Sequence, residues 1–111
     1  MNSAVYITGF GIFLPNEPVS NDDMETRLGQ VGGKPSRARR TVLRSNGIKQ
    51  RYYAIDPKTN TFNFTNAELT ARAVQQIDAP GFSPEQIQCL ASGTSIADQL
   101  LPNHAVMTHG E

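Results

Sequence analysis

Residues 65–77 read TNAELTARAVQQI, and this stretch is the clearest structural signal in the chain. Thr65 followed by Glu68 is typical of a capping box, in which each side chain satisfies a backbone N–H group of the other residue at a helix N-terminus. The apolar residues that recur at helical spacing are Leu69, Ala73, Val74 and Ile77. The stretch therefore predicts an amphipathic helix over 66–77, which ends at the turn formed by residues 78–81.

The segments around this helix predict strands that alternate with helices. Residues 4–10 (AVYITGF) and 87–92 (IQCLAS) have the composition of buried strands. Ser83 and Pro84 predict a single helical turn, and residues 102–103 open a last helix that still continues at His109. Two strands with helices between them indicate an α/β fold. They do not complete a sheet, so we expect the front part of a longer domain.

The remaining segment, residues 11–64, is expected to be more irregular. Pro15 and Pro18 keep the chain extended, and Ser20 is a candidate N-cap for a short acidic helix. Residues 36–45 predict a second helix, residues 48–55 an extended arm, and residues 56–60 a surface turn.

Length and composition exclude several classes of protein. The chain has 111 residues, 38% of them hydrophobic, and a single cysteine. One cysteine and no CxxC pair exclude an internal disulfide and a structural zinc site. No apolar run approaches the roughly 20 residues of a membrane span, and the N-terminus lacks the basic region of a signal peptide. We therefore expect a cytoplasmic protein with no membrane span.

The charges balance to zero but are distributed unevenly. No acidic residue lies between Glu25 and Asp56, and eight of the ten basic residues fall there. These eight are Arg27, Lys34, Arg37, Arg39, Arg40, Arg44, Lys49 and Arg51. Such a segment produces a local positive potential that attracts anions. An anion-binding role for the segment and a solvated surface with internal ion pairs both remain open on this evidence.

The sequence contains three other candidate sites: a dinucleotide-binding motif, a pair of histidines and a cysteine. Gly9 and Gly11 follow a predicted strand, but Leu14 stands where a dinucleotide-binding motif needs its third glycine, and Pro15 prevents a helix from starting there. His104 and His109 are five residues apart and lie on different helix faces, so no metal site is expected. Cys89 is expected to be a buried structural cysteine, because its predicted strand supplies nothing that would lower a thiol pKa. No catalytic residue is therefore expected in this chain.

Short motifs nevertheless follow one another in a familiar order. Residues 7–15 (ITGFGIFLP) are similar to GxGxYLP, residues 19–25 (VSNDDME) to VxTNDDLE, and residues 45–52 (SNGIKQRY) to RTGIRERR. The helix at 66–77 and the segments 83–88, 92–95 and 101–105 match AxxAxxxAL, xPEDID, ATxT and xPSxA. This order resembles the β-ketoacyl-acyl-carrier-protein synthase III enzymes of the thiolase superfamily. Residues 31–37 also resemble a branch that builds alkylresorcinol-type or pigment-related products.

The resemblance implies a fold and an activity. The fold would be the layered αβαβα thiolase-like fold, of which residues 1–111 would be the N-terminal portion, incomplete and truncated before the catalytic cysteine. The activity would be decarboxylative Claisen condensation of an acyl thioester with a malonyl- or β-ketoacyl-carrier thioester, by covalent catalysis on that cysteine. The resemblance implies no cofactor beyond the acyl-CoA or acyl-carrier-protein thioester substrate. It implies an acyl carrier protein, a second copy in a homodimer and the remainder of the same chain as partners.

The resemblance also assigns candidate site residues. Phosphopantetheine or carrier contacts are expected at Arg40, Arg44, Lys49 and Arg51. Leu101 stands where the family places an apolar residue that crosses the dimer interface to the partner's acyl pocket. The chain has Thr41 where the family has a tryptophan that stacks on coenzyme A, and it contains no tryptophan. This difference favours carrier-bound over coenzyme A substrates.

Two alternatives to the condensing enzyme remain open from the sequence. One is a non-catalytic thiolase-fold subunit whose partner carries the cysteine. The other is a small basic module that binds nucleic acid, with Tyr52 and Tyr53 stacking on bases beside Arg51. No recognised nucleic-acid motif is present, so we expect no nucleic-acid partner.

Overall fold

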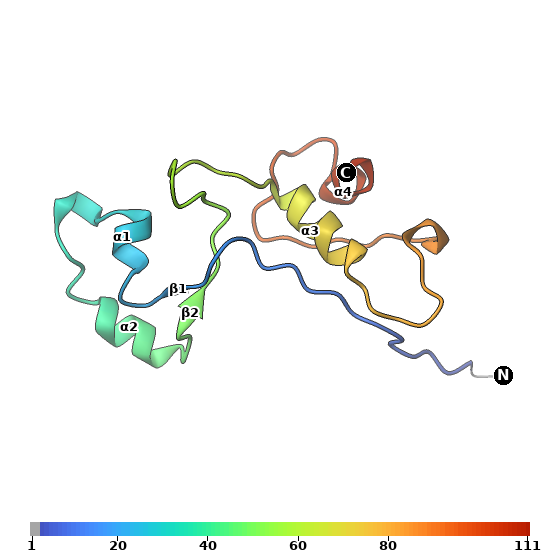
Figure 1. Ribbon diagram of the computed structural model, residues 1–111, viewed down its shortest axis with the longest axis horizontal. Helices are drawn as coiled ribbons and strands as arrows, with labels where there is room; N and C mark the ends of the chain where they lie inside the picture. Colours follow the sequence, from blue (N-terminus) through green and yellow to red (C-terminus); the bar gives the residue numbers. More distant parts are fainter. Residues whose placement is uncertain (1–2) are drawn as a thin grey trace. The chain divides into compact units, whose positions relative to one another are not determined.

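The computed structural model describes residues 3–111 and divides into two compact units (Figure 1). One unit consists of Pro15–Asn63 and carries the elements labelled β1, α1, α2 and β2. The other consists of the residues up to Leu14 together with Phe64–Glu111, and carries α3 and α4.

The Pro15–Asn63 unit is built on a short antiparallel ribbon. Strand β1 (Val19–Ser20) pairs with β2 (Gln50–Arg51), with Val19 opposite Arg51. Helix α1 (Met24–Leu28), a 3₁₀ turn η1 (Val31–Gly33) and helix α2 (Arg39–Ser45) connect the two strands in that order. The predicted helix at 36–45 is therefore confirmed with a later start, and part of the predicted arm at 48–55 is strand β2.

The start of α1 differs from the sequence-based expectation. Ser20 does not cap the helix directly, because the helix begins at Met24 and its N-cap residue is Asp23. The Ser20 hydroxyl instead accepts the Asp23 backbone N–H at 3.2 Å and donates to Asp23 Oδ2 at 2.6 Å. The Ser20 hydroxyl is thus a hydrogen-bond acceptor as predicted, but it stabilises the turn that precedes α1 and not the first turn of the helix.

The predicted turn at 56–60 is confirmed. Asp56 Oδ1 accepts the backbone N–H groups of Lys58 at 2.7 Å and Thr59 at 3.1 Å. The Lys58 hydrogen bond, followed by that from Thr59, lowers the pKa of the Asp56 carboxyl. Asn60 takes a positive φ of 56°, a conformation that asparagine tolerates better than most residues.

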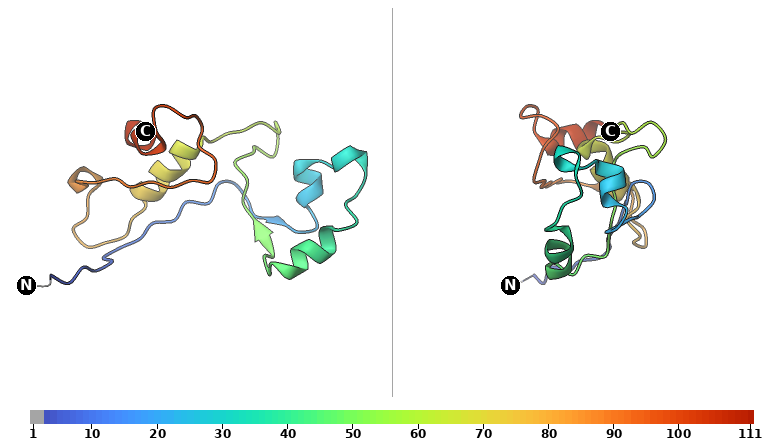
Figure 2. Two further views of the ribbon diagram at one scale, coloured as in Figure 1. Left: turned by 180° about the vertical axis from the view of Figure 1, so that it is seen from behind. Right: turned by 90° about the vertical axis from the view of Figure 1, so that its left-hand side faces the viewer.

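Helix α3 (Asn66–Gln75) is the predicted helix, slightly shorter than expected at its C-terminal end. Its buried residues are Ala67 and Ala71, whereas the residues of the predicted apolar face are only partly buried. Its predicted capping box is confirmed: Thr65 Oγ1 accepts the Glu68 N–H at 3.1 Å, and Glu68 Oε2 accepts the Thr65 N–H at 2.7 Å. Helix α4 (His104–Gly110) packs against α3, and the two lie side by side in both views (Figures 1 and 2). The last predicted helix is therefore confirmed.

Each of the two helices α3 and α4 has two buried residues on one face. The buried residues of α3 are Ala67 and Ala71, and those of α4 are His104 and Thr108. Each pair is four residues apart and so lies on one face of its helix. The Thr108 hydroxyl donates to the His104 carbonyl at 2.9 Å, so its polar group is satisfied within α4.

The two predicted strands are wrong for this structure. Residues 4–9 form no strand, and Phe10 makes only an isolated bridge to Asp78. Val5 and Ile7 are each 94% exposed, so the segment is not buried. Residues 87–92 form no strand either, although the helical turn before them (η2, Pro84–Gln86) is confirmed. A strand exists only where another strand pairs with it, and among residues 3–111 neither segment has such a partner.

Gly9 and Gly11 allow the N-terminal segment to pass close to the end of α3. A Cβ atom on Gly9 would lie 2.7 Å from the Ala79 Cβ. A Cβ atom on Gly11 would lie 2.1 Å from the Ala73 carbonyl oxygen and 2.7 Å from the Ile77 nitrogen. The neighbours of Gly11 are backbone atoms, and the Ala79 Cβ has no torsion that would move it, so the Gly-x-Gly pair serves packing.

Two aromatic rings hold the same segment near α3. Phe13 and Phe64 meet edge to face with centroids 5.4 Å apart. The guanidinium of Arg72 on α3 lies 5.4 Å from the Phe13 centroid and 5.0 Å from the Phe64 centroid, which are cation–π distances. The one basic residue of this unit therefore has a structural role.

The described residues contain no helix that is both long and apolar enough to cross a bilayer. Among the same residues no group of histidine, cysteine or acidic side chains is arranged to hold a metal ion.

We predict that Gly11→Ala lowers the free energy of unfolding of the full-length protein by about 2 kcal/mol or more, because the new methyl group must displace backbone. Chemical denaturation measures this quantity. Gly93→Ala is the matched control, since a Cβ atom at Gly93 has no neighbour within 4 Å. Equal stability of the two variants would contradict the close approach of Gly11 to α3.

Candidate anion-binding surface

The two units carry opposite net charges. The Pro15–Asn63 unit has nine of the ten basic residues and five of the ten acidic ones, which gives a net charge of +4. The other unit has one basic and five acidic residues, which gives −4. The cations of the first unit define the candidate site, and their partners decide which of them can meet an external anion.

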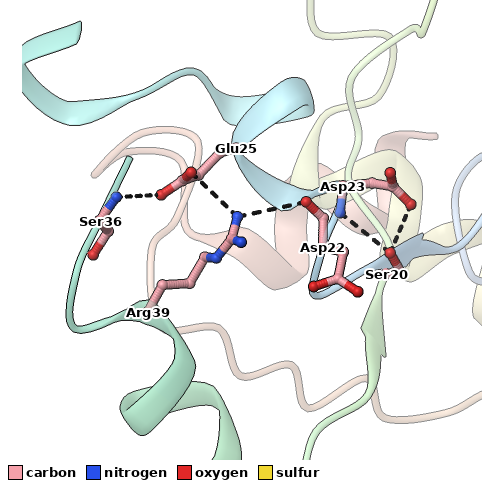
Figure 3. A network of polar contacts seen from close by, with 6 residues as sticks. All are labelled: Ser20, Asp22, Asp23, Glu25, Ser36 and Arg39. Atoms are coloured by element: carbon pink, nitrogen blue, oxygen red, sulfur yellow. Dashed lines mark hydrogen bonds and ion pairs between the residues drawn. The ribbon is translucent and has the colours of Figure 1, made fainter. Parts of the chain in front are cut away.

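Arg39 is engaged inside the unit (Figure 3). Its Nη1 lies 3.2 Å from Glu25 Oε2 and donates to the Asp22 carbonyl at 3.5 Å. The other Glu25 oxygen, Oε1, accepts the Ser36 backbone N–H at 2.8 Å. The side chains of Arg39 and Glu25 are only 28% and 14% exposed. This network joins α1 to α2 and makes Arg39 a structural residue.

Arg51 is held by the ribbon and is half-buried. Its Nη1 donates to Asn21 Oδ1 at 2.6 Å. Asn21 Nδ2 donates in turn to the Ile48 carbonyl at 2.7 Å, which fixes the amide group. Arg51 is thus oriented by an asparagine 30 residues earlier in the chain. Its proposed phosphate contact stays a prediction.

The other three predicted site residues are exposed. Arg40 and Arg44 lie one turn apart on α2, so their side chains share a face of that helix. Lys49 immediately precedes β2. Within residues 3–111 none of these three side chains forms an ion pair, since the one ion pair found there is that of Arg39 with Glu25. Their charges are therefore available to an anion.

An apolar hollow of about 380 Å³ lies between α1 and α2. Leu28, Val31 and Val42 contribute to its wall, and Arg39 also lines it. The unit thus combines exposed positive charge with an apolar depression, although Arg40 and Arg44 do not line the depression itself.

Leu101 belongs to the other unit, where it is 83% exposed. Leu100 beside it is 94% exposed and Ile96 is 79% exposed, so the loop before α4 presents several apolar side chains. Its predicted place at a dimer interface stays a prediction.

The environment of Cys89 differs from the predicted one. It was expected to be buried in a strand, but it is exposed and lines a hollow of about 480 Å³ together with His109 on α4. The physical reason is the missing strand at 87–92, which leaves this segment uncovered within the described residues.

Sequence reasoning missed two polar residues that organise this surface. Glu25 is the last acid before the basic segment, and that position is a signal for its pairing with a basic residue. Asn21 carries no comparable signal, because its partners Ile48 and Arg51 come close only when β1 pairs with β2.

Comparison with curated proteins identifies the relatives of the chain. It is 31% identical over 100 residues to the β-ketoacyl-[acyl-carrier-protein] synthase III of Chelativorans sp. (strain BNC1), a match covering 90% of the chain and 27% of that protein. The predicted resemblance to β-ketoacyl-[acyl-carrier-protein] synthase III is confirmed. The synthase III of Allorhizobium ampelinum is 31% identical over 111 residues, covering 94% of the chain and 31% of that protein.

A third relative has a different name. The acetoacetyl CoA synthase NphT7 of Streptomyces sp. (strain CL190) is 31% identical over 96 residues, covering 86% of the chain and 26% of that protein. The chain therefore spans about a quarter to a third of the length of the synthase III proteins and other curated relatives it matches. No protein-family model matches the chain.

We predict that Arg39→Met lowers the free energy of unfolding of the full-length protein by roughly 1 kcal/mol, since it removes a partly buried ion pair and a hydrogen bond. Arg40→Met is the matched control and should change stability by less than about 0.5 kcal/mol, because Arg40 is exposed. Thermal and chemical unfolding measure both effects. The division between structural and free arginines is wrong if Arg40→Met proves the more damaging.

Proposed function

We propose that the chain is the N-terminal part of a condensing acyltransferase of the synthase III type. The full-length protein would join an acyl thioester to a carrier-bound malonyl unit by decarboxylative Claisen condensation. Similarity to synthase III proteins over nine-tenths of the chain is the observation that carries this proposal. In this proposal the chain contributes to a thiolase-like layered fold, and the nucleophilic cysteine lies outside residues 1–111.

The chemistry has two stages. The acyl group moves from its thioester sulfur to the cysteine Sγ, and the carrier thiol leaves. The malonyl thioester then loses CO₂, its enolate carbon attacks the acyl-enzyme carbonyl, and the cysteine thiolate is released. Each stage receives its substrate on a phosphopantetheine arm, and the malonyl stage requires the carrier protein to dock.

The basic segment would receive that carrier. Acyl carrier proteins are expected to be acidic, and Arg40, Arg44 and Lys49 are exposed and not engaged in ion pairs within residues 3–111. Complementary charge raises the rate of encounter and orients the partner. Thr41, at the position where the resemblance places a tryptophan that stacks on coenzyme A, supports a carrier-bound acyl donor. The proposal includes a cytoplasmic homodimer in which Leu101 reaches the partner's acyl pocket.

We predict that Arg44→Glu in the full-length protein raises the KM for the carrier-bound substrate about tenfold, because it replaces attraction with repulsion at the docking surface. The unfolding temperature should change little, since Arg44 is exposed. Steady-state kinetics with purified malonyl carrier protein and thermal unfolding measure the two effects.

Lys58→Glu is the control, because it makes the same charge change in the same unit but outside the basic segment. It should leave the KM within about twofold of the unaltered protein. Loss of stability that parallels loss of activity in Arg44→Glu would instead make Arg44 a structural residue and remove the support for carrier docking here.

A further inference from the structure

Asp98 completes the N-terminus of α3. The first backbone N–H groups of a helix have no partner within the helix. The capping box satisfies those of Thr65 and Glu68, and Asp98 satisfies the two between them. Its Oδ1 accepts the Asn66 N–H at 2.9 Å, and its Oδ2 accepts the Ala67 N–H at 3.0 Å. A carboxylate in this position also interacts favourably with the helix dipole.

A second contact fixes the chain a few residues later. His104, the first residue of α4, is only 7% exposed, and its Nε2 lies 3.1 Å from the Thr70 hydroxyl on α3. Asn103 caps α4 by accepting the Val106 N–H at 3.0 Å. The segment from Asp98 to His104 is therefore hydrogen-bonded to α3 at both ends. The two attachment points on α3 lie about one helical turn apart.

The residues between these two ties point outward. Leu100 and Leu101 are 94% and 83% exposed. On the other side of Asp98, the Asn66 side chain donates to the Ile96 carbonyl at 2.7 Å, which adds a third tie between this loop and α3. Polar contacts at the base of the loop thus hold apolar side chains in the solvent.

We propose that Asp98 is a positioning residue that fixes the loop 94–101 on α3 and thereby sets the place of Leu101. The inference rests on the proposed function, in which Leu101 shapes an acyl pocket. Asp98 itself touches no substrate in this account. The Asn66 N–H, with further help from the Ala67 N–H, lowers the pKa of the Asp98 carboxyl. At neutral pH Asp98 is therefore the carboxylate that accepts both hydrogen bonds.

Hydrogen–deuterium exchange on the full-length protein tests the positioning role. Asp98→Ala should speed exchange of the Asn66 and Ala67 amides about tenfold or more, because these two amides donate the charge-assisted hydrogen bonds that are lost. Asp98→Asn keeps one acceptor oxygen and should restore part of the protection. Glu68→Gln is the control: it weakens the same helix end through the capping box but leaves the Asp98 contacts intact, so the Asn66 and Ala67 amides should keep their protection.

Kinetics with the acyl thioester supply the second readout. Asp98→Ala and Leu101→Ala should raise its KM by similar factors, with kcat less affected. The inference is overturned if the Asn66 and Ala67 amides exchange no faster in Asp98→Ala than in Glu68→Gln. It is also overturned if these amides lose protection in Asp98→Ala and only Leu101→Ala raises the KM. If they lose protection and neither variant changes the KM, anchoring by Asp98 is supported and the proposed role of Leu101 fails.

Discussion

The pairing of Glu25 with Arg39 joins α1 to α2 in the Pro15–Asn63 unit and separates one structural arginine from the exposed cations. Glu25 is the last acidic residue before Asp56, and it lies 3.2 Å from Arg39. The arginines and lysines between Arg39 and Asp56 have no acidic residue among them, so their charge is not compensated locally. One ion pair therefore fixes α1 to α2, and the exposed cations of α2 stay free for a partner. The proposed docking of an acidic carrier depends on this division.

The elements that were predicted correctly are those with local determinants. The capping box of α3, the turn at Asp56 and the helical turn at Pro84 each depend on residues within a few positions of one another. The strands failed because pairing requires a partner that composition does not reveal. Residues 4–10 have the apolar pattern of a strand, yet no described strand lies beside them. The predicted burial of Cys89 is wrong for the same reason.

The contacts that shape the candidate site were harder to predict. Arg51 depends on Asn21, and the loop before α4 depends on Asp98 reaching the start of α3. Both contacts join residues about 30 positions apart, so they follow from the tertiary structure alone. The sequence shows the charge asymmetry. It does not show which arginines remain free of ion pairs and exposed to an external anion. The glycine pair lacks the spacing of a dinucleotide motif, and Gly11 instead allows a close approach to Ala73 and Ile77 that the sequence did not predict.

The salt dependence of carrier binding tests the central claim most directly. Isothermal titration of the full-length protein with an acyl carrier protein would be repeated between about 50 and about 500 mM salt. Our account predicts that the Kd rises at least about tenfold across this range, because screening weakens attraction between the exposed cations and the acidic carrier. A Kd that does not change with salt would contradict it, since docking would then depend on contacts other than charge.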